Sequence, residues 1–566
     1  MFSSTLLARG QEIHDFLHNL LDQPQNESDK MPDRKNIQGD TWPRLPKKAE
    51  KFIFFRITNV EEFKKGLPMM ADFITTGEAA LKNRVGIFKR KAQGVEGLIQ
   101  GLVSFNIAFS ANGLAKLGAE KLNDDYFNGG QFKDMTAPGE GQSAEDHQGL
   151  DDQGEWVPEF KPSSGGIDGV LTVTGESRES IEKWTKKTFN YTFNVDDKES
   201  SSVEIVYEKE GKVFQNHEEH FGWADGISQP IIKGLDDISV AQNVNGMKPI
   251  DPGVIFVGSE GDESKHPKWA KDGSFMVFRI YEQLVPEFYQ RRRPKNRANR
   301  SRGLGRRWIK WVCFPHDWWD GGLKVRILIQ ESLPAPSPIL EILIKHNALG
   351  APMEVHPLED PNHSKNEDQP WFTTNNLKTL NNTDDFNYNP SDQTRCPYAS
   401  HMRKTGPRDD YPDYNKHVMI RRGIPYGDWC SEEERAMGIT QHERGLLFVS
   451  YQSSIENGFV TQQKRWANSP DGPADMAKHN GGVSQGIDPI IGQVHPSQNG
   501  KSTGAQINAK YQQPPQIPFP DSDLEKPAPQ VYDKKLDLDR IVVPHGGEYF
   551  FTPSIEALKN YLPNRL

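Results

Sequence analysis

The 566-residue sequence predicts an α+β protein built on antiparallel sheets. Two observations support this fold class. Short runs rich in aromatic and β-branched residues, typical of strands, alternate with helical stretches in both halves of the chain. The spacing between these runs lacks the regular strand–helix–strand repeat that a doubly wound parallel sheet requires. Antiparallel sheets flanked by helices are therefore expected.

In the first half, the segment 51–57 (Lys-Phe-Ile-Phe-Phe-Arg-Ile) is short and aromatic, and 102–109 alternates apolar and polar residues, as half-buried strands do. Between these strands, apolar residues recur at helical spacing. The expected strands are 51–57, 102–109, 169–173 and 203–207, and the expected helices are 61–81, 111–117 and 180–189.

The second half shows the same kinds of segment. Glycines bound several apolar runs of strand length, and shorter helical stretches follow two of them. The expected strands are 253–258, 273–280, 445–451 and 548–551, and helices are expected to begin near 285 and to span 554–561.

Composition narrows the possible functions. Hydrophobic residues are 35% and charged residues 26%, with 49 Gly and 40 Pro, which is typical of a loop-rich globular protein of several domains. The net charge of −10 argues against general affinity for nucleic acids or anionic membranes. No apolar run approaches the roughly 18–20 residues of a membrane span. Three cysteines cannot form a disulfide framework.

The N-terminus has no cationic segment followed by a sustained apolar core, so no secretory signal is evident and an intracellular location is expected. Asn-x-Ser/Thr triplets arise by chance and carry little weight without such a signal. They occur at Asn26, Asn190, Asn299, Asn362 and Asn381.

The most informative segment is 220–230, His-Phe-Gly-Trp-Ala-Asp-Gly-Ile-Ser-Gln-Pro. It sets the carboxylate of Asp225 between glycines, which allow a sharp turn and close approach of the backbone to a bulky partner. Taken alone, Asp225 is better explained as an ordinary turn residue. Two later segments change this interpretation: 396–404, Cys-Pro-Tyr-Ala-Ser-His-Met-Arg-Lys, and 420–427, Ile-Arg-Arg-Gly-Ile-Pro-Tyr-Gly.

In this order, the three segments resemble the dye-decolourising peroxidase family of haem enzymes, with a fungal-like pattern. The resemblance spans roughly 36–560 and implies two ferredoxin-like domains with haem in the second. The organisation expected from it is an N-terminal extension at 1–35, an N-terminal domain at 36–210 and a haem-binding domain at 211–566.

The resemblance implies that His401 is the axial ligand of the haem iron, with Asp488, from Asp-Pro-Ile-Ile-Gly at 488–492, accepting its other ring N–H. One haem b is expected, held non-covalently, because no cysteine lies in a covalent attachment motif. His220 is expected against the haem or a propionate. His217 and His220 form an alternative metal-binding pair, but no third ligand lies at a suitable local spacing.

On the opposite side of the haem, Asp225 would take a proton from hydrogen peroxide and return it to the departing oxygen. Arg421 would supply a permanent positive charge, and Arg422 is the alternative because adjacent residues on a strand face opposite ways. An ionised aspartate predicts an acidic activity optimum. Leu446 and Phe448 alternate on one strand face and are expected to line the pocket, although an ordinary buried face fits equally well.

These residues predict a haem peroxidase that reduces hydrogen peroxide and oxidises phenols, dyes and other aromatic donors. Trp466 is a candidate for carrying electrons from bulky donors, although simple packing also explains it. The alternative is a haem carrier or sensor without turnover, or an inactive form. The sequence does not indicate the oligomeric state or the physiological donor.

One stretch departs from the family pattern. The family carries a continuous Gly-Arg-Trp-x-Ser-Gly-Ala-Pro-like segment, whereas this chain has Gly-Arg-Arg-Trp at 305–308 and Gly-Ala-Pro only at 350–352. We interpret 291–346 as an insertion, such as a retained intron would produce. Its first 20 residues carry ten Arg or Lys and no acid, so a nucleic-acid patch is the alternative. That alternative predicts salt-sensitive binding and no haem.

Overall fold

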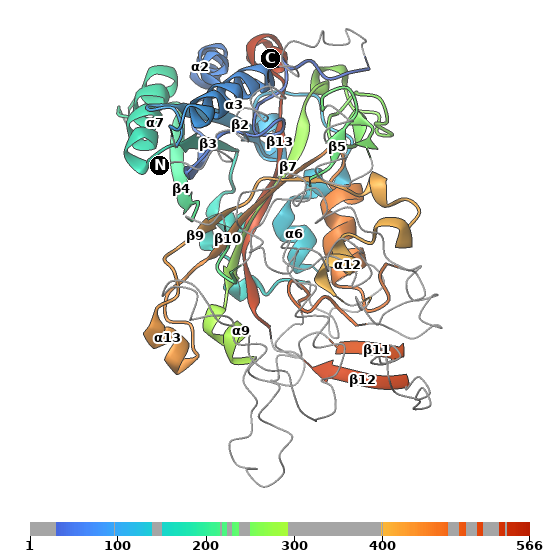
Figure 1. Cartoon of the computed structure of the whole chain (residues 1–566). Coiled ribbons are helices and arrows are strands. Elements are labelled where there is room, and N and C mark those ends of the chain that lie inside the picture. Colours follow the sequence, from blue (N-terminus) through green and yellow to red (C-terminus); the bar gives the residue numbers. More distant parts are fainter. Residues whose placement is uncertain are drawn as a thin grey trace.

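The computed structural model shows a central sheet with helices packed against it (Figure 1). The elements are well separated along the chain but meet in one body. The structure describes residue 18 and residues 30–95, 97–137, 150–197, 199–214, 218–222, 229–236, 249–291, 398, 400–473, 486–493, 506–512, 531–537 and 540–565.

Nine strands form the central sheet in the order β4-β1-β3-β2-β13-β7-β10-β8, with β9 also paired to β10. The first four in this order come from the first half of the chain and alternate with helices along the sequence. Their bounds are Ala49–Ile57 (β1), Val103–Phe109 (β2), Gly169–Gly175 (β3) and Val203–Lys212 (β4).

The second half repeats this arrangement, because β13-β7-β10-β8 has the same fourth-first-third-second order as β4-β1-β3-β2. This order is that of a ferredoxin-like unit. All neighbours in the sheet are antiparallel, and Phe109 of β2 pairs with Phe551 of β13 to join the halves. The strands are Ser274–Gln283 (β7), Ile420–Arg421 (β8), Ile424–Tyr426 (β9), Gly445–Gln452 (β10) and Val542–Thr552 (β13). The predicted fold class is confirmed.

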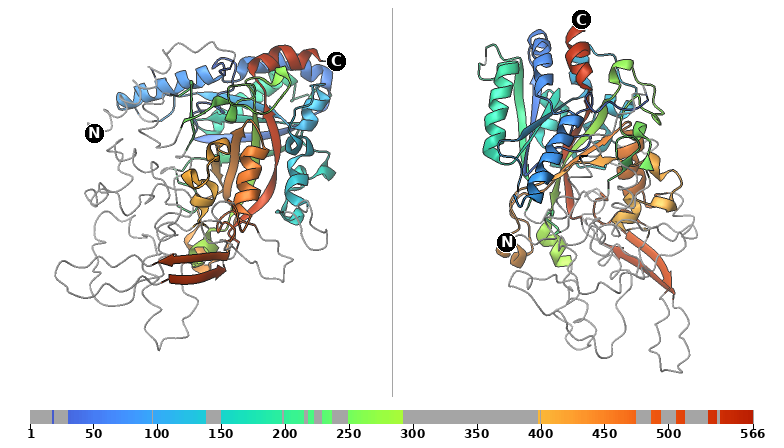
Figure 2. Two further views of the ribbon diagram at one scale, coloured as in Figure 1. Left: turned by 90° about the vertical axis from the view of Figure 1, so that its right-hand side faces the viewer. Right: turned by 45° about the horizontal axis from the view of Figure 1, so that its top comes forward.

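Helices cover the sheet in both halves (Figures 1 and 2). On the first half, α2 and α7 pack over Phe55, which contacts Phe63 and Phe189. On the second half, η10 packs over Phe448 and Tyr549 through Phe459. The longer helices are Val60–Phe73 (α2), Gly77–Ala92 (α3), Arg178–Phe193 (α7) and Glu456–Ala467 (η10).

The remaining helices and strands are short. The helices are Ala111–Lys116 (α4), Asp125–Gly129 (α5), Gln131–Thr136 (α6), Val285–Arg291 (α9), His401–Thr405 (α12), Glu432–Met437 (α13) and Ala557–Tyr561 (η11), and single 3₁₀ turns lie at Gln153–Glu155, Pro158–Phe160, Pro162–Ser164, Pro252–Val254, Lys268–Ala270, Arg408–Asp410, Tyr414–Lys416 and Leu562–Asn564. Two small sheets pair Ile231–Ile232 (β5) with Pro249–Ile250 (β6) and Gln506–Gln512 (β11) with Val531–Asp537 (β12).

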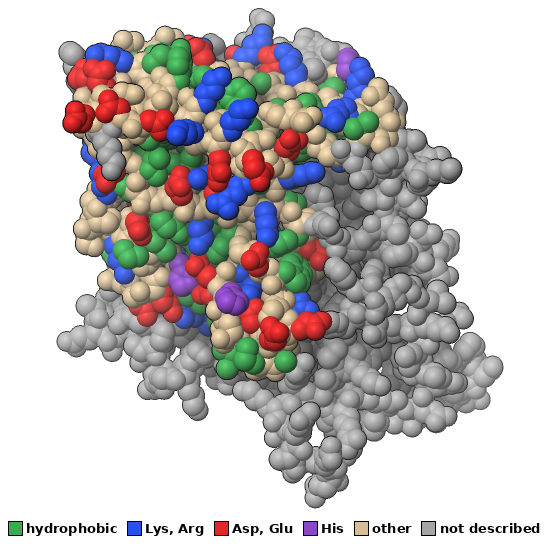
Figure 3. Space-filling model, turned by 90° about the vertical axis from the view of Figure 1, so that its left-hand side faces the viewer, with side chains coloured by type: hydrophobic (Ala, Val, Ile, Leu, Met, Phe, Trp, Pro, Cys, Tyr) green, Lys and Arg blue, Asp and Glu red, His purple; other side chains and the backbone are tan. Residues whose placement is uncertain are grey.

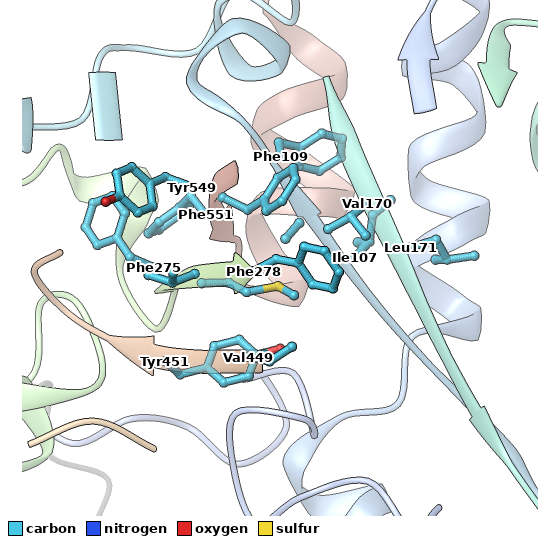
Figure 4. Close-up of a cluster of buried hydrophobic side chains, with 14 of the residues drawn as sticks. Ile107, Phe109, Val170, Leu171, Phe275, Phe278, Val449, Tyr451, Tyr549 and Phe551 are labelled. Carbon is cyan, nitrogen blue, oxygen red and sulfur yellow. The ribbon is translucent and has the colours of Figure 1, made fainter. Parts of the chain in front are cut away.

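The sheet curls so that its outer strands β4 and β9 approach each other. Lys209 of β4 lies 4.4 Å from the ring centroid of Tyr426 on β9. Gly211 comes so close to β9 that a Cβ there would lie 2.8 Å from the Pro425 carbonyl oxygen. The strand faces inside the curl are largely aromatic, with Phe54 packed on Phe278 at 4.8 Å between ring centroids. Figure 4 shows part of this buried cluster.

Two sequence-based predictions of elements are wrong. The expected helix at 61–81 is two helices, because the chain leaves α2 at Ile74, which bridges Phe105 of β2, and restarts at Thr76, whose side chain caps α3. The expected strand at 253–258 instead begins as a 3₁₀ turn, Pro252–Val254, and Val257 exchanges hydrogen bonds with Asp272 and Gly273 without joining the sheet. Its apolar run is buried in the core without strand pairing.

On the face shown in Figure 3, acidic and basic side chains are interspersed over the described residues. Among the helices that the structure describes, none is long and apolar enough to cross a membrane. The boundaries expected at 35 and 210 stay predictions. The expected insertion at 291–346 lies outside the described residues, apart from Arg291 at the end of α9.

Candidate active site

His401 begins the short helix α12 and is held by a buried carboxylate. Its Nδ1 lies 2.7 Å from Oδ2 of Asp488, whose side chain is completely buried, while 17% of the His401 side chain is exposed. The other carboxylate oxygen of Asp488 accepts hydrogen bonds from the backbone N–H groups of Ile490 and Ile491 at 2.7 and 3.0 Å. The imidazole is therefore fixed in orientation, and its Nε2 makes no hydrogen bond to any described residue.

The turn that carries Asp488 is anchored to the end of η10. The Asp488 N–H donates to the Ala467 carbonyl at 2.7 Å. The next residue, Asn468, exchanges two hydrogen bonds with Gln493, at 2.7 and 2.8 Å. The carboxylate thus sits on a rigid support, although it is 87 residues from His401 in sequence.

Arg421 shares a sheet face with Leu446 and Phe448. It pairs directly with Ser450 in the β8–β10 ladder, and directly paired residues of antiparallel strands point to the same face. Successive residues alternate between faces, so Phe448 and Leu446 lie on this face as well. Both are half-buried, whereas Leu447 and Val449 on the other face are completely buried. The face of Arg421 is the more open one.

Arg422 points to the opposite face and is buried there. Its guanidinium donates to the carbonyls of Asp40, Thr41 and Pro43 at 2.7, 3.0 and 3.3 Å. It is therefore occupied in bracing the loop that precedes β1. Of the two adjacent arginines, Arg421 is therefore the one on the Phe448 face.

Asp225 and His217 lie outside the described residues, but the segments on either side of Asp225 are placed. The ring of Phe221 packs on Phe288, with 4.3 Å between centroids. The side-chain oxygen of Gln229 accepts the backbone N–H of Arg421 at 3.0 Å. Gln229, four residues after Asp225, therefore contacts the strand that carries Arg421.

His220 is buried against aromatic rings at the other end of this run. Its Nε2 lies 2.6 Å from the Tyr426 carbonyl oxygen, and its ring contacts those of Phe214 and Trp429. Burial lowers the pKa of His220 to about 4, although the hydrogen bond to the Tyr426 carbonyl opposes the shift. Its expected contact with haem or a propionate stays a prediction.

A second hydrophobic cluster joins the separate segments of the site. Phe221 and Ile490, which lies two residues after Asp488, are both buried in it, and Phe448 and Ile491 pack against it. Its other members are Tyr281, Val285, Cys430, Ile541 and Val542, with Phe288 and Tyr289 packed against them. One apolar cluster thus joins Phe221, the segment that follows Asp488 and the sheet face that carries Phe448.

Comparison with known proteins agrees with this geometry. Residues 36–213 match the model for the DyP dimeric alpha+beta barrel domain, and residues 372–483 match that for the Dyp-type peroxidase C-terminal domain. The dye-decolorizing peroxidase of Exidia glandulosa is 31% identical over 545 residues, covering 93% of this chain and 86% of that protein. The one from Mycena epipterygia is 30% identical over 540 residues, with the same coverage.

Solved structures give the same result. A variant of the dye-decolorizing peroxidase from Pleurotus ostreatus superposes with a TM-score of 0.70 at 31% identity, covering 94% of this chain and 99% of that one. An ancestral D-type dye-decolorizing peroxidase gives 0.67 at 33% identity, with 94% and 100% coverage. The chain belongs to the DyP-type peroxidase family. It is a haem-dependent peroxidase of the dye-decolourising type.

The site of this DyP-type peroxidase fits a haem. No group of three His, Cys, Asp or Glu side chains is placed to hold a metal ion in the part of the chain that the structure describes. A haem iron needs only one axial imidazole from the protein. His401 offers Nε2 for this role while its Nδ1 is held by Asp488. The half-buried face of Leu446 and Phe448 offers the apolar surface that a porphyrin requires.

Trp466 is almost completely buried at the end of η10, with 2% of its surface exposed. It packs against the rings of Tyr411, Tyr414 and His417, at centroid distances of 5.3, 6.4 and 5.3 Å. A bulky donor could therefore not touch Trp466 directly. Its role in electron transfer stays a prediction.

Sequence reasoning missed two residues that shape the site in this peroxidase. Gln229 binds the backbone of Arg421, and the only available signal was its place at the end of the Asp225 run. Lys404 lies one turn after His401, is completely buried, and donates to three backbone carbonyls. A lysine beside an arginine in a short helix looks solvent-exposed in sequence, so no local signal marks its burial.

Proposed function

We propose that this peroxidase uses one non-covalent haem b, bound through His401, to reduce hydrogen peroxide at the expense of phenols and dyes. The observation that carries the proposal is that Ile490, which follows the His401 partner Asp488, and Phe448, on the face of Arg421, meet in one apolar cluster. One solved relative is a dye-decolorizing peroxidase in complex with 2,6-dimethoxyphenol, and a phenol of this kind is the donor class that we propose here.

Bound haem would supply the redox chemistry: peroxide would oxidise it, and one-electron donors would reduce it again. His401 would bind the iron through Nε2. Asp488 would accept the Nδ1–H and make the imidazole more basic, which favours cleavage of the peroxide O–O bond. Because Asp488 also accepts two backbone N–H groups, its carboxylate is held in position.

On the other side, Asp225 would accept a proton from the near oxygen of peroxide and deliver it to the far oxygen, which leaves as water. Arg421 would stabilise the negative charge that develops on the leaving oxygen. An aspartate beside the positive charge of a guanidinium stays ionised in acid, so the proposal predicts an acidic optimum.

Two variants test the proposal through absorption spectra taken before and after one equivalent of peroxide at acidic pH. Asp225→Asn should keep the Soret band of the wild type but fail to respond to peroxide. His401→Ala should lose the ordinary haem spectrum. A fully active Asp225→Asn variant would refute the proton-transfer role. A wild-type Soret band that never responds to peroxide would instead indicate a haem carrier or sensor.

A further inference from the structure

Lys404 is a buried lysine in the helix that begins at His401. It lies in α12, three residues after His401, and its side chain is completely buried. Its Nζ donates to the carbonyl oxygens of Ser469, Gly472 and Gly486 at 2.9, 2.6 and 2.9 Å. Three acceptors saturate the three N–H donors of an ammonium group.

The three carbonyls belong to the two segments that support Asp488. Ser469 and Gly472 follow the end of η10, and Gly486 lies two residues before Asp488. These segments also bond to each other, because Gly486 donates to Pro470 at 3.0 Å and Asp488 to Ala467 at 2.7 Å. Lys404 therefore ties the helix of the axial histidine to the turn that carries the partner of that histidine.

The charge of Lys404 also interacts with that of Asp488. Burial lowers the pKa of Lys404 to about 7, and the negative charges of Asp488 and Asp471 oppose this shift. At the acidic pH expected for the enzyme, the ammonium is therefore charged. A buried carboxylate is stabilised by a nearby fixed cation, so Lys404 contributes charge balance as well as geometry.

We propose that Lys404 is a positioning residue for the axial ligand, fixing the Asp488 turn against α12 and so setting the strength of the His401–Asp488 hydrogen bond. The inference rests on the proposed roles of His401 and Asp488. Partners behind a metal-binding histidine orient its ring and tune its basicity. Removing the ammonium leaves three buried carbonyls without their donor, and the turn must relax to find others.

The test is resonance Raman spectroscopy of the ferrous enzyme, which reports the iron–histidine stretch. Lys404→Met should lower the stretching frequency, because a weaker hydrogen bond to Asp488 makes the imidazole a weaker donor. Haem loss to an acceptor protein should also become roughly 10-fold faster. Asp488→Asn should lower the same frequency, and the double variant should equal Asp488→Asn alone, because Lys404 acts through Asp488.

Lys64→Met is the matched control. Lys64 is also a buried lysine that donates to a backbone carbonyl, that of Arg565 at 2.5 Å, but it lies on α2 in the first half. This variant should lower the stability of the fold and leave the iron–histidine stretch unchanged. A merely structural role of Lys404 would give the same pattern in Lys404→Met, and that result would overturn the inference.

Lys404→Gln covers the case in which Lys404→Met does not fold. The amide keeps two N–H donors without the charge, so a frequency between wild type and Asp488→Asn is expected, and an unchanged frequency would overturn the inference. His401→Ala separates the two proposals. If it retained the wild-type stretch, the proposed ligand would be wrong. If it lost the stretch while Lys404→Gln left it unchanged, only the role of Lys404 would fail.

Discussion

Arg421 and Arg422 are neighbours in sequence, but replacing each by Met should have opposite consequences. Arg421 lies half-buried on the face of Phe448. Arg422 is 7% exposed on the other face and holds three carbonyls of the loop before β1. Arg422→Met should therefore cost stability, and Arg421→Met should cost turnover.

The expected loss for Arg422→Met follows from its contacts. Each hydrogen bond to a charged group contributes about 1.5–3 kcal/mol, but such contributions are not additive. Met keeps much of the stem and leaves little cavity, so the lost bonds dominate. Each buried carbonyl left without a donor costs about 1–3 kcal/mol, so for three carbonyls we expect a loss of about 3–5 kcal/mol in the free energy of unfolding.

Arg421→Met should change the free energy of unfolding by less than about 1 kcal/mol, as expected of a half-exposed side chain. It should slow the reaction with peroxide by about 10²–10³-fold, the usual effect of removing one charge-stabilising donor. Urea titration measures the first quantity, and stopped-flow mixing of the haem-loaded enzyme with peroxide measures the second. Each variant is the control for the other.

The reasoning would be refuted if the two effects were exchanged. A folded Arg422→Met enzyme with a 10²-fold slower peroxide reaction and normal stability would show that Arg422 is the arginine of the pocket. A wild-type peroxide rate in Arg421→Met would remove Arg421 from the mechanism.

Three further predictions concern stability, each measured by urea titration. Hydrogen bonds from Arg444 and the backbone outweigh burial and lower the pKa of Glu434 to about 2, so the stability this carboxylate contributes is present above pH ~4.5 and is lost as the pH falls toward 2. Glu434→Gln should remove that pH dependence, and an unchanged acid profile would contradict it. Burial raises the pKa of Glu548 to about 7, so its contribution is present below pH ~4.5 and is lost as the pH rises through 7. Glu548→Gln should stabilise the protein above pH 7 relative to wild type, and equal profiles would count against this. The buried Tyr451 hydroxyl donates to Asp40 at 2.7 Å, so Tyr451→Phe should cost about 1–3 kcal/mol and leave the Soret band unchanged. A changed haem spectrum would show that this pair reaches the site.

Most strands could be predicted because their apolar alternation is local. The segments 51–57 and 445–451 each lie within a strand of the structure, and all of 273–280 except Gly273 lies within β7. The two errors arose where a long-range contact decided the outcome. Ile74 leaves the helix to bridge β2. The apolar residues 255–257 are buried as a turn, and periodicity cannot distinguish burial in a turn from burial in a strand.

The candidate site was predictable only as a set of residue types. The segments 396–404 and 420–427 marked His401 and Arg421 through resemblance, and resemblance marked Asp488 as well. None of the three is close to another in sequence. The structure describes the His401–Asp488 contact, whereas Asp225 lies outside the described residues and its role rests on sequence and on its neighbours Phe221 and Gln229.

The sequence by itself determined the α+β class, the family and the residues able to carry the chemistry, because strand periodicity and short motifs are local properties of the chain. Only the tertiary structure decided which of Arg421 and Arg422 shares a face with Phe448, since strand pairing sets the direction of each side chain. It alone showed that Lys404, three residues after His401, is buried. Its three carbonyl partners lie 65, 68 and 82 residues away, and no local pattern records a contact over that separation.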